Sequence, residues 1–425
     1  MKTHLPLRLP SLRDFGRDAR LLILISGTTA VSFFGVVSLL RTLYVLRLGY
    51  GPAYVGAYLS AGALTFMTMG VPSGMLGERF GTRRVMLVGG WIWVIGMSLL
   101  SLTEVLQPPI RDLWPFISQI VLTIGWSTIQ VNTVPALMAV TQDFNRSSAY
   151  ALSSAVRGAG TFVGTLVGGA LPSLIALLLG LDRTLESATP YGLALLVGSL
   201  LGILTLVLLA KIEGGAAAPP DRAAVLERGP FPFIPIAVMI VYVYLRHTGW
   251  STCQAFCNPY LDTELALPTS ALGLITSAGQ VAAIGATLMI PRLARRWNHG
   301  WIVAASTAML AASLALLAFL PHWSTAGLGL LGVQVSAAMW LPALQVFQME
   351  LVTEGWRGLS YGAVTMAMGL GFGSMSLVGG YVIEAQGYNT LFTAGIGLAL
   401  IATVVMGVVS QRQQVQLAPA LEGAE

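Results

Sequence analysis

Three arginines lie within long apolar stretches of the chain, where a charge is costly. Arg246, followed directly by His247, is near the middle of its stretch, and Arg157 and Arg41 lie within two others. Removing an ionised side chain from water costs several kcal/mol unless it faces a polar cavity or a partner. Arginine stays protonated and binds carboxylates or phosphates through two parallel hydrogen bonds. We therefore predict an anionic ligand for these residues, with Arg246 as the first candidate.

Other polar and aromatic side chains of the same stretches could orient or line this ligand. They are Tyr44, Trp126, Gln130, Trp250, Gln254, Asn258 and Trp340. Each tryptophan has the alternative of ordinary packing or a place at a membrane surface. Arg41 could instead reach outward to lipid headgroups, and Arg157 could bond to backbone carbonyls.

Acidic residues are missing from the middle of every apolar stretch. A buried proton carrier would have to be His247 or Glu350, because arginine does not deprotonate. No nucleotide-binding motif G-x-x-x-x-G-K-[ST] occurs, and Cys253 and Cys257 are expected to be core residues. We predict that the protein is not an enzyme and holds no metal or cofactor.

The composition places most of the chain in lipid. Of 425 residues, 55% are hydrophobic and 10% are charged, with a mean hydropathy of +0.75, whereas soluble domains carry about 25% charged residues. A net charge of +5 is too small and dispersed to indicate nucleic-acid binding. We expect a multi-pass protein of the cell (inner) membrane, a monomer whose partners are lipids, a small-molecule substrate and an optional coupling ion such as H⁺.

Twelve stretches are long enough to cross a bilayer, which needs about 20 apolar residues each. They are 21–46, 53–76, 84–104, 113–140, 147–176, 190–211, 232–260, 268–291, 300–320, 324–350, 358–384 and 388–410. The predicted organisation is therefore an N-terminal segment (1–20), a six-helix bundle (21–211), a linker (212–230), a second bundle (231–410) and a tail (411–425) that looks disordered.

The basic residues predict the orientation. With both termini in the cytoplasm, seventeen of the 23 basic residues are cytoplasmic, and only Arg47, Arg111 and Arg183 lie outside. Such an excess of Lys and Arg marks cytoplasmic loops. The N-terminal segment, the linker and the tail are therefore predicted to be cytoplasmic.

The two halves of the chain repeat each other at shifts of 217 and 211 residues. Matched pairs are Gly56 with Gly273, Ser60 with Ser277, Gly158 with Gly369, and Leu166-Val167-Gly168-Gly169 with Leu377-Val378-Gly379-Gly380. Six spans per half insert both halves the same way up. This predicts parallel repeats related by an axis along the membrane normal, with a site between them near the midplane.

A charged loop between the second and third spans carries a family signature. It reads Gly74-Met75-Leu76-Gly77-Glu78-Arg79-Phe80-Gly81-Thr82-Arg83-Arg84. This resembles the loop G-x-L-x-[DE]-R-x-G-x-[RK]-[RK] of the major facilitator superfamily, with Glu78 in place of the usual Asp. A degenerate copy, Leu293 to Trp297, lies between the eighth and ninth spans. The resemblance covers nearly the whole chain.

The resemblance implies an all-α integral membrane fold of twelve helices in two parallel-repeat bundles. It implies a secondary transporter working by alternating access, with spans 1, 4, 7 and 10 facing the cavity. Glu78 would meet the N-terminus of span 11, near Arg357 and Gly358, as a latch of the outward-open state. Gly160, Gly164 and Gly168 would pack span 5 against a helix of the opposite half.

Three functions stay open from the sequence. The leading one is efflux or exchange of a small organic solute, including an anionic one held by Arg246. The second is a proton-driven multidrug efflux antiporter with an adaptable apolar cavity, which sixteen methionines and ten tryptophans would suit. The third is a non-transporting membrane sensor or partner protein on the same fold.

Overall fold

A computed structural model describes residues 12, 15–180, 186–213, 231–294, 296–353 and 356–422, with backbone only for 143–147, 291, 358 and 412–422. This part of the chain consists of helices joined by short turns and loops. The helices are α1 (Arg17–Thr29), η2 (Ala30–Val37), α2 (Ser38–Arg47), α3 (Pro52–Phe80), α4 (Thr82–Ser101), η3 (Thr103–Val105), α5 (Ile110–Ala139), α6 (Asp143–Leu178), α7 (Thr189–Ala210), α8 (Phe233–Thr263), α9 (Thr269–Leu293), α10 (His299–Phe319), α11 (Trp323–Leu351) and α12 (Arg357–Glu422).

Local residues explain where several helices begin and end. Pro52 opens α3, where a missing N–H costs nothing. Gly81 separates α3 from α4 with φ +86°, a conformation that glycine adopts without strain. Asn298 precedes α10, and its side chain accepts a hydrogen bond from Trp301 N at 2.9 Å. These caps place the turns at the ends of long apolar segments.

The described residues contain eleven helical segments that are long and apolar enough to span a membrane. The first combines α1, η2 and α2. The last, 53 residues long, is broken at Gly387, where φ is 83° and ψ is 172°. This break falls between the predicted spans 358–384 and 388–410, so α12 supplies spans 11 and 12. The predicted twelve-helix membrane fold is confirmed.

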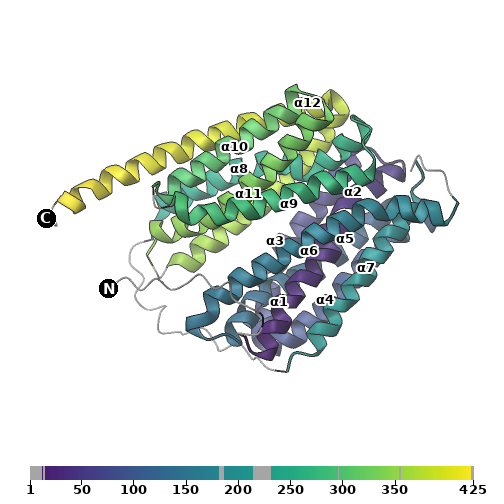
Figure 1. Ribbon diagram of the computed structural model, residues 1–425, viewed down its shortest axis with the longest axis horizontal. Helices are drawn as coiled ribbons and strands as arrows, with labels where there is room; N and C mark the ends of the chain where they lie inside the picture. Colours follow the sequence, from purple (N-terminus) through teal and green to yellow (C-terminus); the bar gives the residue numbers. More distant parts are fainter. Residues whose placement is uncertain are drawn as a thin grey trace.

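The spans form two bundles, α1–α7 and α8–α12, which Figure 1 shows in purple to teal and in green to yellow. We call the side where span 1 begins and span 12 ends the terminal side, and the opposite side the far side. The positive-inside prediction places the terminal side in the cytoplasm. Residues 214–230 of the expected linker lie outside the described residues.

The halves meet at two equivalent backbone crossings near the far side. A Cβ on Gly56 of α3 would lie 3.3 Å from the Cα of Gly380 in α12 and would overlap the Ser376 carbonyl. A Cβ on Gly273 of α9 would lie 2.9 Å from the Cα of Gly169 in α6, and 2.7 Å from the Thr165 carbonyl oxygen. The sequence repeat relates these two crossings to each other. We call them the glycine crossings.

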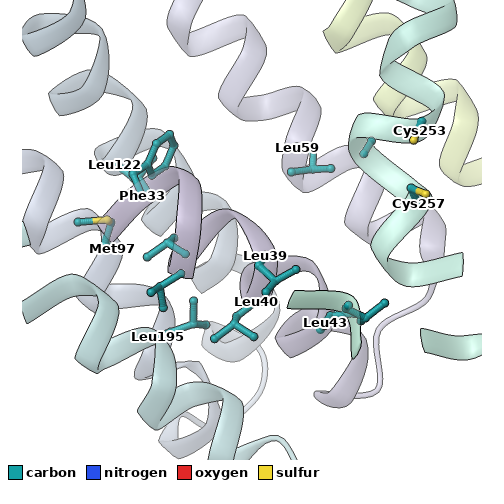
Figure 2. Packing of buried hydrophobic residues seen from close by; sticks show 14 of the residues in the cluster. Phe33, Leu39, Leu40, Leu43, Leu59, Met97, Leu122, Leu195, Cys253 and Cys257 are labelled. Atoms are coloured by element: carbon teal, nitrogen blue, oxygen red, sulfur yellow. The ribbon is translucent and has the colours of Figure 1, made fainter. Parts of the chain in front are cut away.

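The buried apolar residues show which parts of the halves are joined. One cluster runs through the N-terminal bundle and on into the far part of the C-terminal bundle. Figure 2 shows it passing from Leu122 and Leu195, through Leu39 and Leu43, toward Cys253 and neighbouring Cys257. Both cysteines are buried, as predicted. A second cluster, which includes Tyr242 and Trp340, fills the terminal part of the C-terminal bundle separately.

Contacts between α3 and α12 stop partway toward the terminal side. Along one face of α3, Gly56 adjoins Gly380, Ala63 adjoins Gly373 and Met67 adjoins Gly369. Farther along, Gly70 of α3 and Gly362 of α12 have open space where a Cβ would be. The close approaches between α3 and α12 that these residues mark therefore run from the far side to mid-span, and Gly70 and Gly362 are not part of them.

The glycine stripe of α6 packs differently from the expectation. Gly160, Gly164 and Gly168 do make close contacts, but their neighbours are Gly27, Val31, Gly35 and Val36 of span 1, in the same half. The residues of α6 that meet the opposite half are Thr165 and Gly169, on the adjacent face. A four-residue period identifies a packing face but not its partner helix.

The chain after residue 410 also differs from the expectation. The predicted disordered tail continues as helix to Glu422, and Figure 1 shows this helix projecting at the left, beyond the other helices. Gln, Leu and Ala are good helix formers, and extending an existing helix needs no new nucleation.

The glycine crossings give a stability prediction. Gly273→Leu should destabilise the far-closed state by about 1–3 kcal/mol, because overpacking displaces two backbones. It should lower the apparent unfolding temperature of the detergent-solubilised protein. Gly285→Leu, on the same helix but with open space at its Cβ position, is the control. Equal unfolding temperatures for the two variants would contradict the assignment.

Candidate functional site

Arg246 of α8 is the most deeply buried cation of the described chain. Its relative exposure is 1%, and its Nε and Nη2 are buried without a hydrogen-bond partner among the described residues. Its Cζ lies 3.8 Å from the ring centroid of Trp340 on α11. A cation over an indole face gains about 2 kcal/mol when desolvated. That is less than the several kcal/mol that burying an ion costs, so the ring contact alone does not compensate the burial of this charge.

A chain of hydrogen bonds fixes the Trp340 ring. Trp340 Nε1 donates to Tyr242 Oη at 2.9 Å, and Tyr242 Oη lies 2.7 Å from Thr307 Oγ1. Thr307 Oγ1 in turn donates to the Val303 carbonyl at 2.8 Å. The chain links α11, α8 and α10, so the face that Trp340 turns toward Arg246 is held by three helices.

His247 and Trp250 extend this group along α8. The His247 ring lies 4.7 Å from Trp250 and 6.1 Å from Trp340, between centroids, and Trp250 lies 6.5 Å from Phe372 of α12. His247 Nδ1 is buried, and no described residue makes a hydrogen bond to it. We call Arg246, His247, Trp250, Trp340 and Phe372 the Arg246 cluster. Phe372 was not predicted, because nothing in the sequence links it to α8.

A second cluster lies in the N-terminal bundle. Arg41 of α2 has its Cζ 5.8 Å from the Phe33 centroid, and Phe33 stacks on Trp126 of α5 at 4.9 Å. Arg41 Nε is buried and has no hydrogen-bond partner within the described ranges. Phe33 belongs to η2, a π-helical segment of span 1 where Gly35 meets the backbone of Gly164. Such segments occur often at functional sites.

One further residue near Arg41 was not among the predicted site residues. Tyr58 of α3 is fully buried, interacts electrostatically with Arg41, and has no hydrogen-bond partner for its hydroxyl among the described residues. It comes from another helix than Arg41, so sequence spacing could not connect them.

The remaining predicted residues are not brought into either cluster. Tyr44 is buried in the N-terminal bundle, where its hydroxyl donates to the Ser101 carbonyl at 3.3 Å. Arg157 is exposed on α6, and Gln254 is exposed on α8. Gln130 and Asn258 are half-buried on α5 and α8. Their roles in binding stay predictions.

An ion pair joins the two halves on the far side. Arg47 Nη2, at the end of α2, donates to Asp262 Oδ1 of α8 at 2.8 Å, and Nη1 lies 2.7 Å from Oδ2. The Asp262 side chain is 4% exposed and that of Arg47 is 21% exposed. Two parallel contacts of this kind are stronger than a single ion pair.

Further polar contacts close the same side. Glu384 of α12 accepts a hydrogen bond from Ala53 N, in the first turn of α3, at 3.0 Å. Thr165 and Ser277 hydroxyls lie 2.6 Å apart across α6 and α9. Each contact crosses between the halves near a glycine crossing, so the close backbone approach and the polar contacts act together.

The charged loop after α3 is held within its own half. Arg83 Nη2 donates to the Ala210 carbonyl at the end of α7, at 2.9 Å, where a cation is favoured by the helix dipole. Arg79 lies over the Phe80 ring, 5.3 Å from its centroid. Glu78 is exposed and makes no ion pair or hydrogen bond within the described residues. The latch to Arg357 therefore stays a prediction for another state.

The other residues of the loop differ in exposure. Leu76 and Arg84 are exposed, Gly74 faces Val131, and Gly81 makes the turn. Among the described residues, no group of three His, Cys, Asp or Glu is placed to hold a metal ion.

Comparison with known sequences finds a family match. The family described as Major Facilitator Superfamily matches residues 21–258 and 246–422. The chain is also 26% identical over 147 residues to "Multidrug resistance protein MdtH" of Proteus mirabilis (strain HI4320). That match covers 35% of this chain and 35% of the relative, so it spans about a third of either protein.

Solved structures share the fold at low identity. A mutant of the nucleoside transporter NupG has a TM-score of 0.72 at 16% identity, covering 91% of this chain and 99% of NupG. A bacterial homologue of the human lysosomal transporter Spinster, inward-facing and unoccupied, scores 0.71 at 14% identity, covering 92% and 96%. A D-xylose–proton symporter scores 0.70 at 16% identity, covering 91% and 95%.

The far-side ion pair gives a conformational prediction. Asp262→Asn should cost the far-closed state about 2 kcal/mol, because it leaves the partly buried Arg47 without its counter-ion. The far-open population should then rise roughly 30-fold. Spin labels at Val105→Cys and Phe319→Cys, both exposed on the far side, with Cys253 and Cys257 replaced, would report a longer distance between the halves.

A pair on the terminal side serves as the control. Arg17 and Glu213 contact each other in the N-terminal bundle, with side chains 58% and 71% exposed. Exposed pairs contribute little to stability, so Glu213→Gln should leave the distance distribution unchanged. An unchanged distribution in Asp262→Asn would show that Arg47 and Asp262 do not hold the far side closed.

Proposed function

The chain belongs to the major facilitator superfamily, and we propose that it carries a small organic anion across the membrane by alternating access, with Arg246 as the anion-binding residue. The single observation behind this proposal is the buried Arg246 guanidinium, whose Nε and Nη2 have no hydrogen-bond partner in the part of the chain that the structure describes. Unsatisfied buried donors are costly, and a carboxylate or phosphate would satisfy both at once.

The setting of Arg246 supports an anion over a cation. Its close neighbours are aromatic rings and the Tyr242 hydroxyl, and it makes no ion pair with an acid of the described chain. A bound cation would meet an uncompensated positive charge. Trp250 and His247, both half-buried, extend the aromatic wall that would contact the apolar part of the substrate.

Alternating access requires that the path to Arg246 close on the far side in one state and on the terminal side in the other. In the state described here the far side is closed by the glycine crossings and by Arg47 with Asp262. The substrate would enter or leave Arg246 from the terminal side, which the basic loops assign to the cytoplasm. The lack of a mid-span acid favours exchange over proton coupling, and efflux or exchange is the proposed direction.

Transport by reconstituted vesicles tests the role of Arg246. A panel of labelled monocarboxylates, dicarboxylates and phosphate esters would first be screened for exchange by the wild-type protein. For a transported anion, Arg246→Gln should reduce the initial rate about 100-fold, which corresponds to two lost hydrogen bonds to a charged group. Arg246→Lys should be nearly as impaired, because an ammonium cannot donate in two parallel bonds.

Arg292→Gln is the matched control, since Arg292 is exposed at the end of α9. It should keep the wild-type rate. Undiminished exchange by both Arg246 variants would reject the proposed anion site, and loss of exchange in the control would assign the effect to net charge.

A proton-driven multidrug exporter is the second candidate. The partial match to a multidrug resistance protein and the aromatic Arg246 cluster favour it. Vesicles with an imposed pH gradient would decide between the two. Extrusion of a lipophilic cationic dye that persists in Arg246→Gln would favour the multidrug exporter over the anion carrier.

A further inference from the structure

A groove lies on the C-terminal bundle, away from both arginine clusters. Its volume is about 470 Å³, and its walls include Arg296, Trp297, Trp301, Ala305, Ala308 and Thr403. Trp301, Ala305 and Ala308 follow one face of α10, while Thr403 comes from the second arm of α12. The volume is within the range of small-molecule sites.

The groove faces outward from the bundle. The opposite face of α10, with Ile302, Val303 and Thr307, is buried in the C-terminal core. The contacts that join the halves are made by other spans or by the first arm of α12. A groove on this side of a membrane-spanning helix opens toward the acyl chains of the bilayer rather than toward the transport path.

The chemistry of the groove changes along its length. Alanines make its floor, because their small side chains leave space between α10 and α12. The Thr403 hydroxyl is satisfied within its own helix, donating to the Ala399 carbonyl at 2.8 Å. The Thr403 hydroxyl therefore needs no hydrogen bond from a ligand, and this part of the groove can bind a hydrocarbon chain.

The terminal end of the groove is cationic and aromatic. Arg296 is exposed there, and Trp297 and Trp301 are 51% and 37% exposed. Tryptophans at the end of a span occupy the headgroup level of a bilayer. An arginine at that level binds phosphate through two parallel hydrogen bonds. Charge and depth together match an anionic phospholipid.

We propose that this groove is a binding site for one anionic phospholipid of the terminal-side leaflet, with its phosphate at Arg296 and an acyl chain along Ala305 and Ala308. The site is separate from the substrate path and does not depend on the proposed function.

Thermal unfolding of delipidated protein tests this site. The buried Cys253 and Cys257 would report unfolding through a thiol-reactive dye. Titration with dioleoyl phosphatidylglycerol should raise the unfolding temperature at lower concentrations than dioleoyl phosphatidylcholine does. Arg296→Gln should weaken the phosphatidylglycerol effect about fivefold, which corresponds to one basic residue at a membrane surface, and should remove the preference between the lipids.

Filling the groove is the second arm of the test. Ala305→Leu with Ala308→Leu should abolish the stabilisation by phosphatidylglycerol, and because both positions are exposed the core is left intact. Ala394→Leu, exposed elsewhere on α12, should behave as wild type. Equal responses to the two lipids in wild type, or undiminished phosphatidylglycerol stabilisation after filling, would overturn the proposal. The proposal would also be overturned if the wild type were a dimer and the filled variant a monomer, because the groove would then be a contact between two copies of the protein.

Discussion

The packing of the two halves depends on the two glycine crossings, where helix backbones meet without intervening side chains. Because Gly56 lies against Gly380 and Gly273 against Gly169, the far ends of the halves approach closely. Lipid supplies no hydrophobic force between helices, so close packing and hydrogen bonds hold them. The approach also brings Arg47 within reach of Asp262. The far side is consequently closed by close backbone packing, by polar contacts and by the apolar cluster that continues between the halves.

The buried arginines share an environment that leaves some of their guanidinium donors without a hydrogen-bond partner among the described residues. Arg41 lies near the Phe33 ring and Arg246 over the Trp340 ring, and neither is paired with an acid of the described chain. A ring attracts the face of a guanidinium, whereas carboxylates and phosphates bind its N–H edge. The rings therefore lower the cost of burial without occupying the donors. A carboxylate partner would have occupied them.

Features carried by one helix were predictable from the sequence, and features shared between helices were not. The run of spans and the break near Gly387 follow from hydropathy and one glycine. His247 and Trp250 follow Arg246 along α8, so their proximity needed only helical spacing. Tyr58 beside Arg41 and Phe372 beside Trp250 depend on how separate helices meet. The stripe Gly160 to Gly168 shows the same limit, since its period is local but its partner is not.

Spans 2 and 11 run antiparallel, and each carries a carboxylate near its C-terminal end. At the far side, Glu384 of α12 accepts from Ala53 N in the first turn of α3. At the terminal side, Glu78 ends α3 on the side where α12 begins at Arg357. A helix N-terminus attracts an anion at either end. The Glu384 contact in this state and the Glu78 latch predicted for the opposite state would therefore both place a carboxylate at the N-terminus of a helix in the other half. A ligand reverses such an equilibrium only by as much free energy as separates its affinities for the two states.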